Sequence, residues 1–176
     1  MACSRCLILG DPLSGKTAFI TQYLYSFTSP SYIPTTQPKQ YKYTISYPSP
    51  SKTLEIIESR DIPNGLIFSS VIIIYDPTRP ESLYYAQNLI NTLRKISKHA
   101  FGCAIVASVR GNEKVFNGKK IADEMSVKFM TVNVNNRMSV KRCFGFCWKW
   151  TQKNLIWESR KNALAIREGV KSFRLA

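Results

Sequence analysis

The sequence predicts an α/β domain in which helices cover both faces of a mainly parallel sheet. Short apolar runs alternate with segments whose apolar residues recur at helical spacing, which is typical of such domains. The most apolar run, at 71–74, is β-branched throughout, as expected of a strand buried on both faces. A glycine-rich loop joins the first apolar run to the first helical segment. We expect one domain over residues 1–166 and a short basic tail over 167–176.

The first half of the chain contains three expected strands and one helix. The apolar run 6–9 ends at a glycine and predicts a buried strand, and apolar residues at helical spacing predict a helix over 16–25. Residues 26–40 are rich in Ser, Thr and Pro without periodicity, which predicts a loop. A Pro-Ser-Pro turn separates two strand-like segments, 41–47 and 53–58, so we expect a hairpin there.

The second half alternates strands and helices. Residues 66–75 predict the central strand, and Asp-Pro ends it. Apolar residues at helical spacing follow over 80–98, and a further buried strand is expected at 103–109. The remaining expected elements are a short helix at 119–125, a strand at 128–134 and a long helix from 138 to about 165.

The strongest chemical signal is the loop 10–17, which reads GDPLSGKT and matches the P-loop pattern of Gly, four residues and Gly-Lys-Ser/Thr. In this motif, backbone N–H groups and a helix N-terminus face phosphate oxygens. Lys16 is expected to reach the β- and γ-phosphates, and the Thr17 hydroxyl to coordinate Mg²⁺. A glycine turn beside an exposed lysine is the alternative reading. The residues expected to bind the nucleotide here are Gly10, Leu13, Ser14, Gly15, Lys16, Thr17 and Ala18.

Three short motifs carry a family resemblance: GKTA at 15–18, YIPT at 32–35 and YDPT at 75–78. With the order of the elements, they make the chain resemble the Ras superfamily of small GTPases, with Ras-like and Rab-like features, over nearly its whole length. The resemblance implies a Ras-like P-loop NTPase fold that binds GTP or GDP with Mg²⁺. It also implies that Thr35 senses the γ-phosphate through Mg²⁺, with Thr36 as its neighbouring rival.

The second switch departs from the family pattern. Residues 54–61 read LEIIESRD, where the family has a strand ending in Asp, two residues, Gly and then commonly Gln. Glu58 replaces the aspartate and could still reach Mg²⁺ through a water. Asp61 replaces the glycine and brings negative charge near a phosphate, while Ile62 cannot orient a hydrolytic water. Slow or partner-dependent hydrolysis is therefore expected, and no catalytic residue is assigned.

The segments that would select guanine depart further. Residues 108–111 read SVRG in place of the family's Asn-Lys-x-Asp box, and 133–135 read NVN in place of Ser-Ala-Lys. Phe27 comes one residue early for the aromatic that packs on the base. Asn112 or Asn133 could substitute in part. The identity of the base therefore stays open.

Charge and composition limit the partners. The chain has 25 Lys and Arg against 11 Asp and Glu, a formal net charge of +14, which favours an acidic membrane surface or an acidic protein partner. Nucleic acid ranks below these because no zinc-finger spacing or RNA-binding aromatic motif accompanies the charge. Five cysteines, an odd number, favour a reducing compartment. We expect a cytoplasmic monomer, peripheral membrane attachment being an alternative, without a membrane span or prenylation motif.

The last predicted helix combines aromatic and basic residues. Trp150 and Trp157 fall near Lys149, Lys153 and Arg160. Such a face is typical of contact with a membrane interface or an acidic partner. A solvated helix face with ordinary packing is the alternative.

Two functions from different classes fit these observations. The first is a divergent small GTPase-like switch in signalling or trafficking, with effector or regulator proteins as partners. The second is a catalytically inactive pseudo-GTPase that serves as a protein-interaction scaffold. A P-loop kinase is weaker because the sequence shows no lid-like arginine cluster.

Overall fold

The computed structural model describes residues 3–28, 37–45, 52–97, 101–111, 118–146 and 149–150. Their strands form one six-stranded sheet in the order β2-β3-β1-β4-β5-β6. The strands are β1 (Cys3–Leu9), β2 (Lys39–Ile45), β3 (Lys52–Glu58), β4 (Ser70–Tyr75), β5 (Gly102–Val109) and β6 (Lys128–Asn133). The helices with defined bounds are α1 (Lys16–Tyr25), α2 (Pro80–Ile96) and α3 (Gly118–Glu124), and residues 137–146 are also helical.

The sheet is parallel except at one edge. β1 pairs in parallel with both β3 and β4, and the parallel ladder continues through β5 to β6. The edge strand β2 runs antiparallel to β3. The predicted α/β class with a mainly parallel sheet is confirmed.

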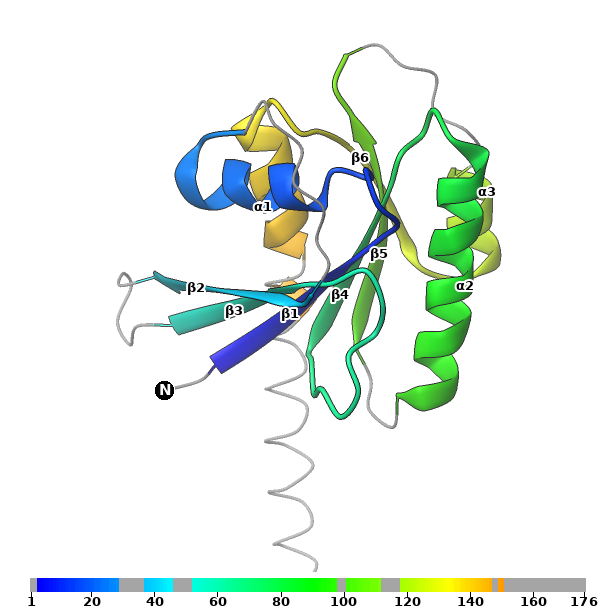
Figure 1. The fold of residues 1–176 in the computed structure, drawn as a ribbon, viewed down its shortest axis with the longest axis horizontal. Helices are drawn as coiled ribbons and strands as arrows, with labels where there is room; N and C mark the ends of the chain where they lie inside the picture. The colour runs from blue at the N-terminus through cyan, green and yellow to red at the C-terminus, as the bar shows by residue number, and fades with distance from the viewer. Residues whose placement is uncertain are drawn as a thin grey trace, which may run out of the picture.

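Helices cover both faces of this sheet. Figure 1 shows α1 and the helical segment 137–146 on one side, and α2 with α3 on the other. Alternate residues of each strand contribute to two hydrophobic cores, one on each face of the sheet, because successive side chains of a strand point to opposite faces. Ile8 and Ile72 pack with Phe19 of α1, whereas Leu7 and Ile73 pack with α2. All six residues of β4 are buried, in agreement with its prediction as the central strand.

The topology brings the carboxyl ends of distant strands together. From β1 the chain passes to β2 and β3 on one side, and later to β4, β5 and β6 on the other. In open α/β sheets a crevice forms outside the carboxyl ends of the strands where the connections change direction. The ends of β1, β3, β4 and β5 therefore surround the loop 10–17.

Most predicted elements occur within two residues of their expected bounds, but the start of the central strand was predicted wrongly. β4 begins at Ser70, so residues 66–69 are not part of it as expected. The segment turns at Gly65, whose φ of +68° lies in the left-handed region, and Ser69 donates its backbone N–H to the Arg5 carbonyl at 3.0 Å. Leu66 and Phe68 still pack against the core, which explains their apolar character.

The last predicted helix is described only in part. Residues 137–146 and 149–150 are helical, while the rest of the expected helix and the predicted tail 167–176 lie outside the described residues. A Cβ added to Gly102 would lie 2.4 Å from Cγ of Trp150, so this indole packs against the start of β5. Trp150 thus takes part in packing within the domain, and Trp157 lies outside the described residues. Every helix in the described part of the chain is too short or too polar to cross a bilayer.

Candidate functional site

The centre of the candidate site is the glycine loop, residues 10–17, which connects β1 to α1. Gly10 has φ +152°, and a Cβ there would lie 2.1 Å from the Ile74 carbonyl oxygen. Gly15 has φ +92°, and a Cβ there would lie 2.7 Å from Oγ of Ser108. Because a side chain at either position would collide with the neighbouring strand, both glycines are required for the loop to pack on the ends of β4 and β5.

The N-terminus of α1 opens into this loop. Its N-cap residue, Gly15, supplies no side-chain hydrogen bond, and the first turn contains no acidic residue. Leu13 adopts a left-handed conformation with φ 67° and is 51% exposed. The positive end of the helix dipole therefore faces the loop without a carboxylate from the first turn to balance it.

Lys16 folds back over the loop instead of extending into solvent. Its ammonium donates to the carbonyl oxygens of Gly10 at 2.9 Å and Asp11 at 2.8 Å, and the residue is 5% exposed. Desolvation lowers the pKa of Lys16, and the carboxylates of Glu58 and Asp11 oppose this effect. An ammonium has three N–H groups, so one more can donate to an anion beside the loop.

A second group of side chains lies at the start of α1. Thr17 donates its hydroxyl to Oε1 of Glu58 at 2.5 Å, and Tyr41 donates to Oε2 at 2.9 Å. Glu58 is the last residue of β3 and is completely buried. Burial, followed by the charge of Glu58, raises the pKa of the Tyr41 hydroxyl, which therefore stays protonated and donates.

The predicted Mg²⁺ ligands come together in part. Thr17 and Glu58 are adjacent, whereas Thr35 and its rival Thr36 lie outside the described residues. Within the described ranges, no three His, Cys, Asp or Glu side chains cluster as a metal site. A hydroxyl beside one carboxylate fits Mg²⁺ bound mainly through phosphate oxygens and water, which is its usual mode in nucleotide sites.

Tyr41 is a site residue that was not predicted from the sequence. β2 and β3 are antiparallel, and Tyr41 pairs with Ile56, two residues before Glu58. Diagonal neighbours on one face of a hairpin are within reach of an aromatic side chain. The predicted hairpin left the pairing of its two strands open, and only the strand register brings Tyr41 and Glu58 together on one face.

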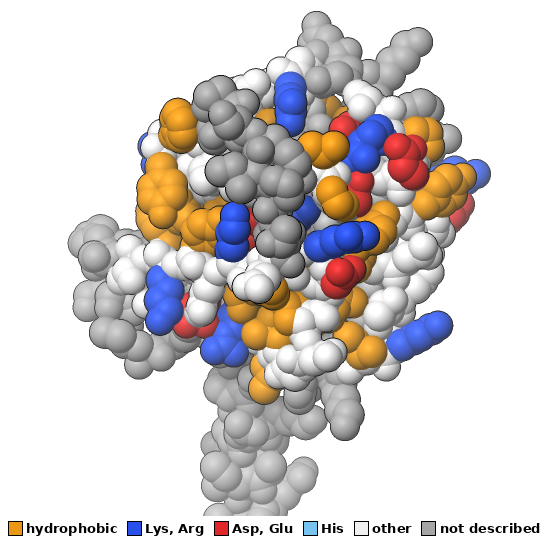
Figure 2. Space-filling view, in the orientation of Figure 1, with side chains coloured by type: hydrophobic (Ala, Val, Ile, Leu, Met, Phe, Trp, Pro, Cys, Tyr) orange, Lys and Arg blue, Asp and Glu red, His pale blue; other side chains and the backbone are white. Residues whose placement is uncertain are grey.

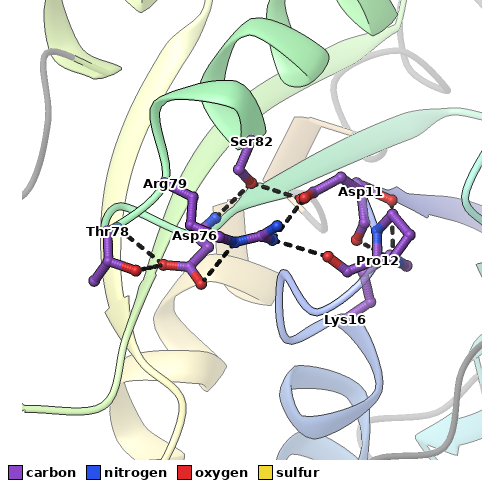
Figure 3. Close-up of polar contacts among 8 residues, drawn as sticks. Asp11, Pro12, Lys16, Asp76, Thr78, Arg79 and Ser82 are labelled. Carbon is purple, nitrogen blue, oxygen red and sulfur yellow. Dashed lines mark hydrogen bonds and ion pairs between the residues drawn. The ribbon is translucent and has the colours of Figure 1, made fainter.

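A third group fixes the other side of the glycine loop (Figure 3). Arg79 donates through Nη2 to Oδ2 of Asp11 at 2.6 Å and to the Pro12 carbonyl at 2.9 Å. Its Nε donates to Asp76 at 3.3 Å. Ser82 donates to Oδ1 of Asp11 at 2.6 Å and accepts the backbone N–H of Asp76 at 2.8 Å. The turn between β4 and α2 therefore holds the loop from outside.

A cavity of about 330 Å³ adjoins the glycine loop. Ser14 is one of its lining residues, and the Ser14 hydroxyl oxygen is buried without a hydrogen-bond partner among the described residues. The full lining is Leu13, Ser14, Asp76, Thr78, Arg79, Ser108 and Arg110. The lining thus combines two arginines and one aspartate with hydroxyl residues and one leucine.

Of the segments expected to recognise a base, one reaches the candidate site and another is engaged elsewhere. Ser108 contacts the glycine loop and Arg110 lines the cavity, so the first segment reaches the site. Asn133 is engaged locally, because its Oδ1 accepts the backbone N–H of Asn135 at 2.9 Å. Asn112 lies outside the described residues, and Phe27 is 56% exposed.

The segment that follows β3 is held against α2. Tyr85 of α2 donates its hydroxyl to Oδ1 of Asp61 at 2.6 Å, and Ile62 packs against the core on the α2 face. Burial, and then this hydrogen bond, raises the pKa of Tyr85. Both Asp61 and Ile62 are therefore held by groups of α2 and the adjacent core.

The predicted site is thus contiguous where the structure describes it. Gly10, Leu13, Ser14, Gly15, Lys16, Thr17 and Ala18 lie on one loop and helix start, and Glu58 joins them from β3. No protein-family model matches this sequence, and no curated protein matches it significantly.

Proposed function

We propose that this chain is a Ras-like P-loop NTPase domain that binds GTP or GDP with Mg²⁺ and acts as a switch in signalling or trafficking. The observation that carries the proposal is the glycine loop, where Lys16 folds over the loop carbonyls and the N-terminus of α1 opens beside it. A loop of this shape with an uncapped helix end fits a polyphosphate.

Each part of the site has a role in this proposal. Lys16 and the backbone N–H groups of the loop bind the β- and γ-phosphates. Thr17 and Glu58 hold Mg²⁺, with Thr35 as a further ligand, and Tyr41 orients Glu58. A bound Mg²⁺ supplies positive charge that neutralises the phosphate oxygens.

Hydrolysis is slow or depends on a partner in this proposal. Asp61 is engaged by Tyr85, and Ile62 is apolar and packs in the core. A hydrolytic water needs a positioned polar group, which a regulator protein would have to supply. Effector and regulator proteins are therefore the expected partners.

The basic surface supports a second type of partner. Figure 2 shows Lys and Arg side chains dispersed over one face among polar and apolar groups rather than gathered in a single patch. With a net charge of +14, long-range attraction to an acidic membrane or acidic protein is favoured. We include peripheral membrane attachment in the proposal on this ground alone.

The test is nucleotide binding by purified protein and by Lys16→Ala. Wild-type protein with Mg²⁺ should bind a fluorescent GDP or GTP analogue with micromolar or tighter affinity. Loss of a charged hydrogen bond worth about 2 kcal/mol should weaken binding roughly thirtyfold in the variant. The matched control is Lys42→Ala, which removes the same charge from an exposed lysine in a 3.9 Å ion pair. Equal binding by wild type and Lys16→Ala would refute the phosphate site.

The pseudo-GTPase scaffold is the second candidate. It is favoured by the contact of Asp61 with Tyr85, which joins the segment after β3 to α2 through protein groups alone. In this case a partner protein should bind wild type and Lys16→Ala with equal affinity. For the nucleotide-binding proposal, the base preference is measured separately, by identifying the nucleotide that copurifies with native protein.

A further inference from the structure

The glycine loop is weakly held by its own backbone. Between Asp11 and Ser14, the one hydrogen bond described within the loop backbone joins the Ser14 N–H to the Asp11 carbonyl at 3.4 Å. Pro12 has no N–H to donate. Leu13 adopts a left-handed conformation with φ 67°, which costs free energy for a residue with a side chain. Apart from Lys16, which donates to the Asp11 carbonyl at 2.8 Å, contacts from outside the loop must therefore stabilise this part of it.

Arg79 provides most of these contacts. Its Nη2 donates to both Asp11 and Pro12, at 2.6 and 2.9 Å, while Nε donates to Asp76. Asp76 is itself fixed, because Oδ1 accepts both the backbone N–H and the hydroxyl of Thr78, at 2.9 and 2.6 Å. One planar guanidinium thus joins the loop to the turn before α2 (Figure 3).

The geometry requires an arginine. A guanidinium carries its N–H donors in a fixed planar fork, so it can serve a carboxylate, a carbonyl and a second carboxylate together. A lysine ammonium in the same place would keep the charge beside Asp11 but would not reproduce the three directed contacts. Ser82 adds a further contact to Asp11, from the first turn of α2.

We propose that Arg79 is a positioning residue for the nucleotide site, which acts through Asp11 and Pro12 and holds the glycine loop in its phosphate-binding shape. The proposal rests on the function proposed above. Arg79 stabilises the loop before the ligand arrives, so its loss raises the cost of ordering the loop on binding.

The experiment compares Arg79→Ala and Arg79→Lys with Arg5→Ala in the full chain. Arg5 is a matched control, because it forms a 2.7 Å ion pair with Glu55 and the two side chains are 44% and 11% exposed. The Arg79 and Asp11 side chains are 30% and 10% exposed in their 2.6 Å pair. Two quantities are measured: the dissociation constant of a fluorescent GDP analogue with Mg²⁺, and amide hydrogen exchange of the nucleotide-free loop.

We expect Arg79→Ala to weaken nucleotide binding roughly tenfold and to accelerate exchange at the loop amides of Leu13 and Ser14. Arg79→Lys should recover part of both effects. Arg5→Ala should lower the melting temperature to a similar extent while leaving binding and loop exchange unchanged. A role of Arg79 in general stability alone would instead give both alanine variants the same binding constant.

The two proposals fail in different ways. Unchanged loop exchange in Arg79→Ala would overturn the positioning role, whether or not the protein binds nucleotide. Nucleotide binding by folded Arg79→Ala within twofold of wild type would also overturn it. Absence of nucleotide binding by wild type itself would refute the proposed function. Should Arg79→Ala fail to fold, Asp11→Asn replaces it, because this variant keeps the Arg79 guanidinium and weakens its contact with residue 11. Unchanged amide exchange of the loop in Asp11→Asn would then overturn the positioning role.

Discussion

The close approach of Gly15 to Ser108 predicts that Gly15→Ala destabilises the protein and that Ser108→Ala restores part of the lost stability. A Cβ at Gly15 would lie 2.7 Å from the Ser108 hydroxyl oxygen but 3.7 Å from the Ser108 Cβ, which is an ordinary contact. The collision of a Gly15→Ala variant therefore comes from one oxygen atom. Ser108→Ala removes that atom and leaves the rest of the packing in place.

The magnitude has a conformational part and a steric part. The backbone at Gly15 has φ +92° and ψ 15°, and holding a residue with a side chain there costs about 1–3 kcal/mol. The collision with the hydroxyl adds a further cost of about 1–3 kcal/mol, as in an overpacked core. We expect Gly15→Ala to lower the free energy of unfolding by about 3 kcal/mol in total. The double variant should recover the steric part and keep the conformational cost of about 1–3 kcal/mol relative to wild type.

The assay is equilibrium unfolding in urea for wild type, both single variants and the double variant. Unchanged m values would show that all four unfold from equally compact states to similar denatured states. The interaction free energy of this cycle isolates the steric part. A double variant as unstable as the sum of the two single variants would refute the collision. A cost below about 0.5 kcal/mol for Gly15→Ala would refute the strained loop conformation as well.

Three further predictions concern the metal side of the site, hydrolysis and pH. Tyr41→Phe removes a donor to Glu58, so the Mg²⁺ concentration for half-maximal nucleotide binding should rise severalfold; an unchanged Mg²⁺ titration contradicts the role of Tyr41. Asp61→Gly combined with Ile62→Gln supplies the glycine and water-positioning residue that the family resemblance implies, and single-turnover GTP hydrolysis should increase at least about tenfold. No increase in phosphate release would show that another part of the site limits hydrolysis. Burial raises the pKa of Cys143 above its ordinary value of 9.0, so above about pH 9 the thiol ionises in the unfolded chain first. The stability contributed by the neutral Cys143 thiol is fully present below about pH 9. Above that pH, the free energy of unfolding falls by about 1.4 kcal/mol per pH unit until the folded-state pKa is reached. Urea unfolding at pH 8 and 10 should therefore show a steeper loss in wild type than in Cys143→Ala, and equal losses would contradict the prediction.

Local patterns predicted the elements well because burial follows the periods of strand and helix. The run 71–74 was expected at the sheet centre, and β4 is buried along its whole length. The error at 66–69 has the same origin: Leu66 and Phe68 are apolar because they pack on the core, although their backbone is outside the strand. Periodicity reports which side chains are buried, and it does not report which backbone groups pair.

The contacts that shape the site could be predicted only where they are local. The loop 10–17 was visible because its glycines, lysine and threonine are adjacent in the chain. Arg79 meets Asp11 across 68 positions, and Tyr41 meets Glu58 through a hairpin register that the sequence does not specify. Such pairs depend on strand order, which composition and spacing leave open.

Under the proposed function, the arrangement of the site would let phosphate binding persist while other parts of a switch diverge. The glycine loop is shaped by β1, α1 and the ends of β4 and β5, with Arg79 as its outside support. Two departures from the pattern that the resemblance implies, Asp61 and Ile62, are on the segment after β3, where Tyr85 and the core hold them. Under the same proposal, changes on that segment remove the arrangement for hydrolysis without altering a described contact that fixes the loop. Two other departures do touch this region: Glu58 accepts the Thr17 hydroxyl, and Ser108, in the expected base-reading segment, touches the loop at Gly15. A small residue there fits the close approach of β5 to the loop, which gives position 108 a packing constraint that base recognition alone would not impose.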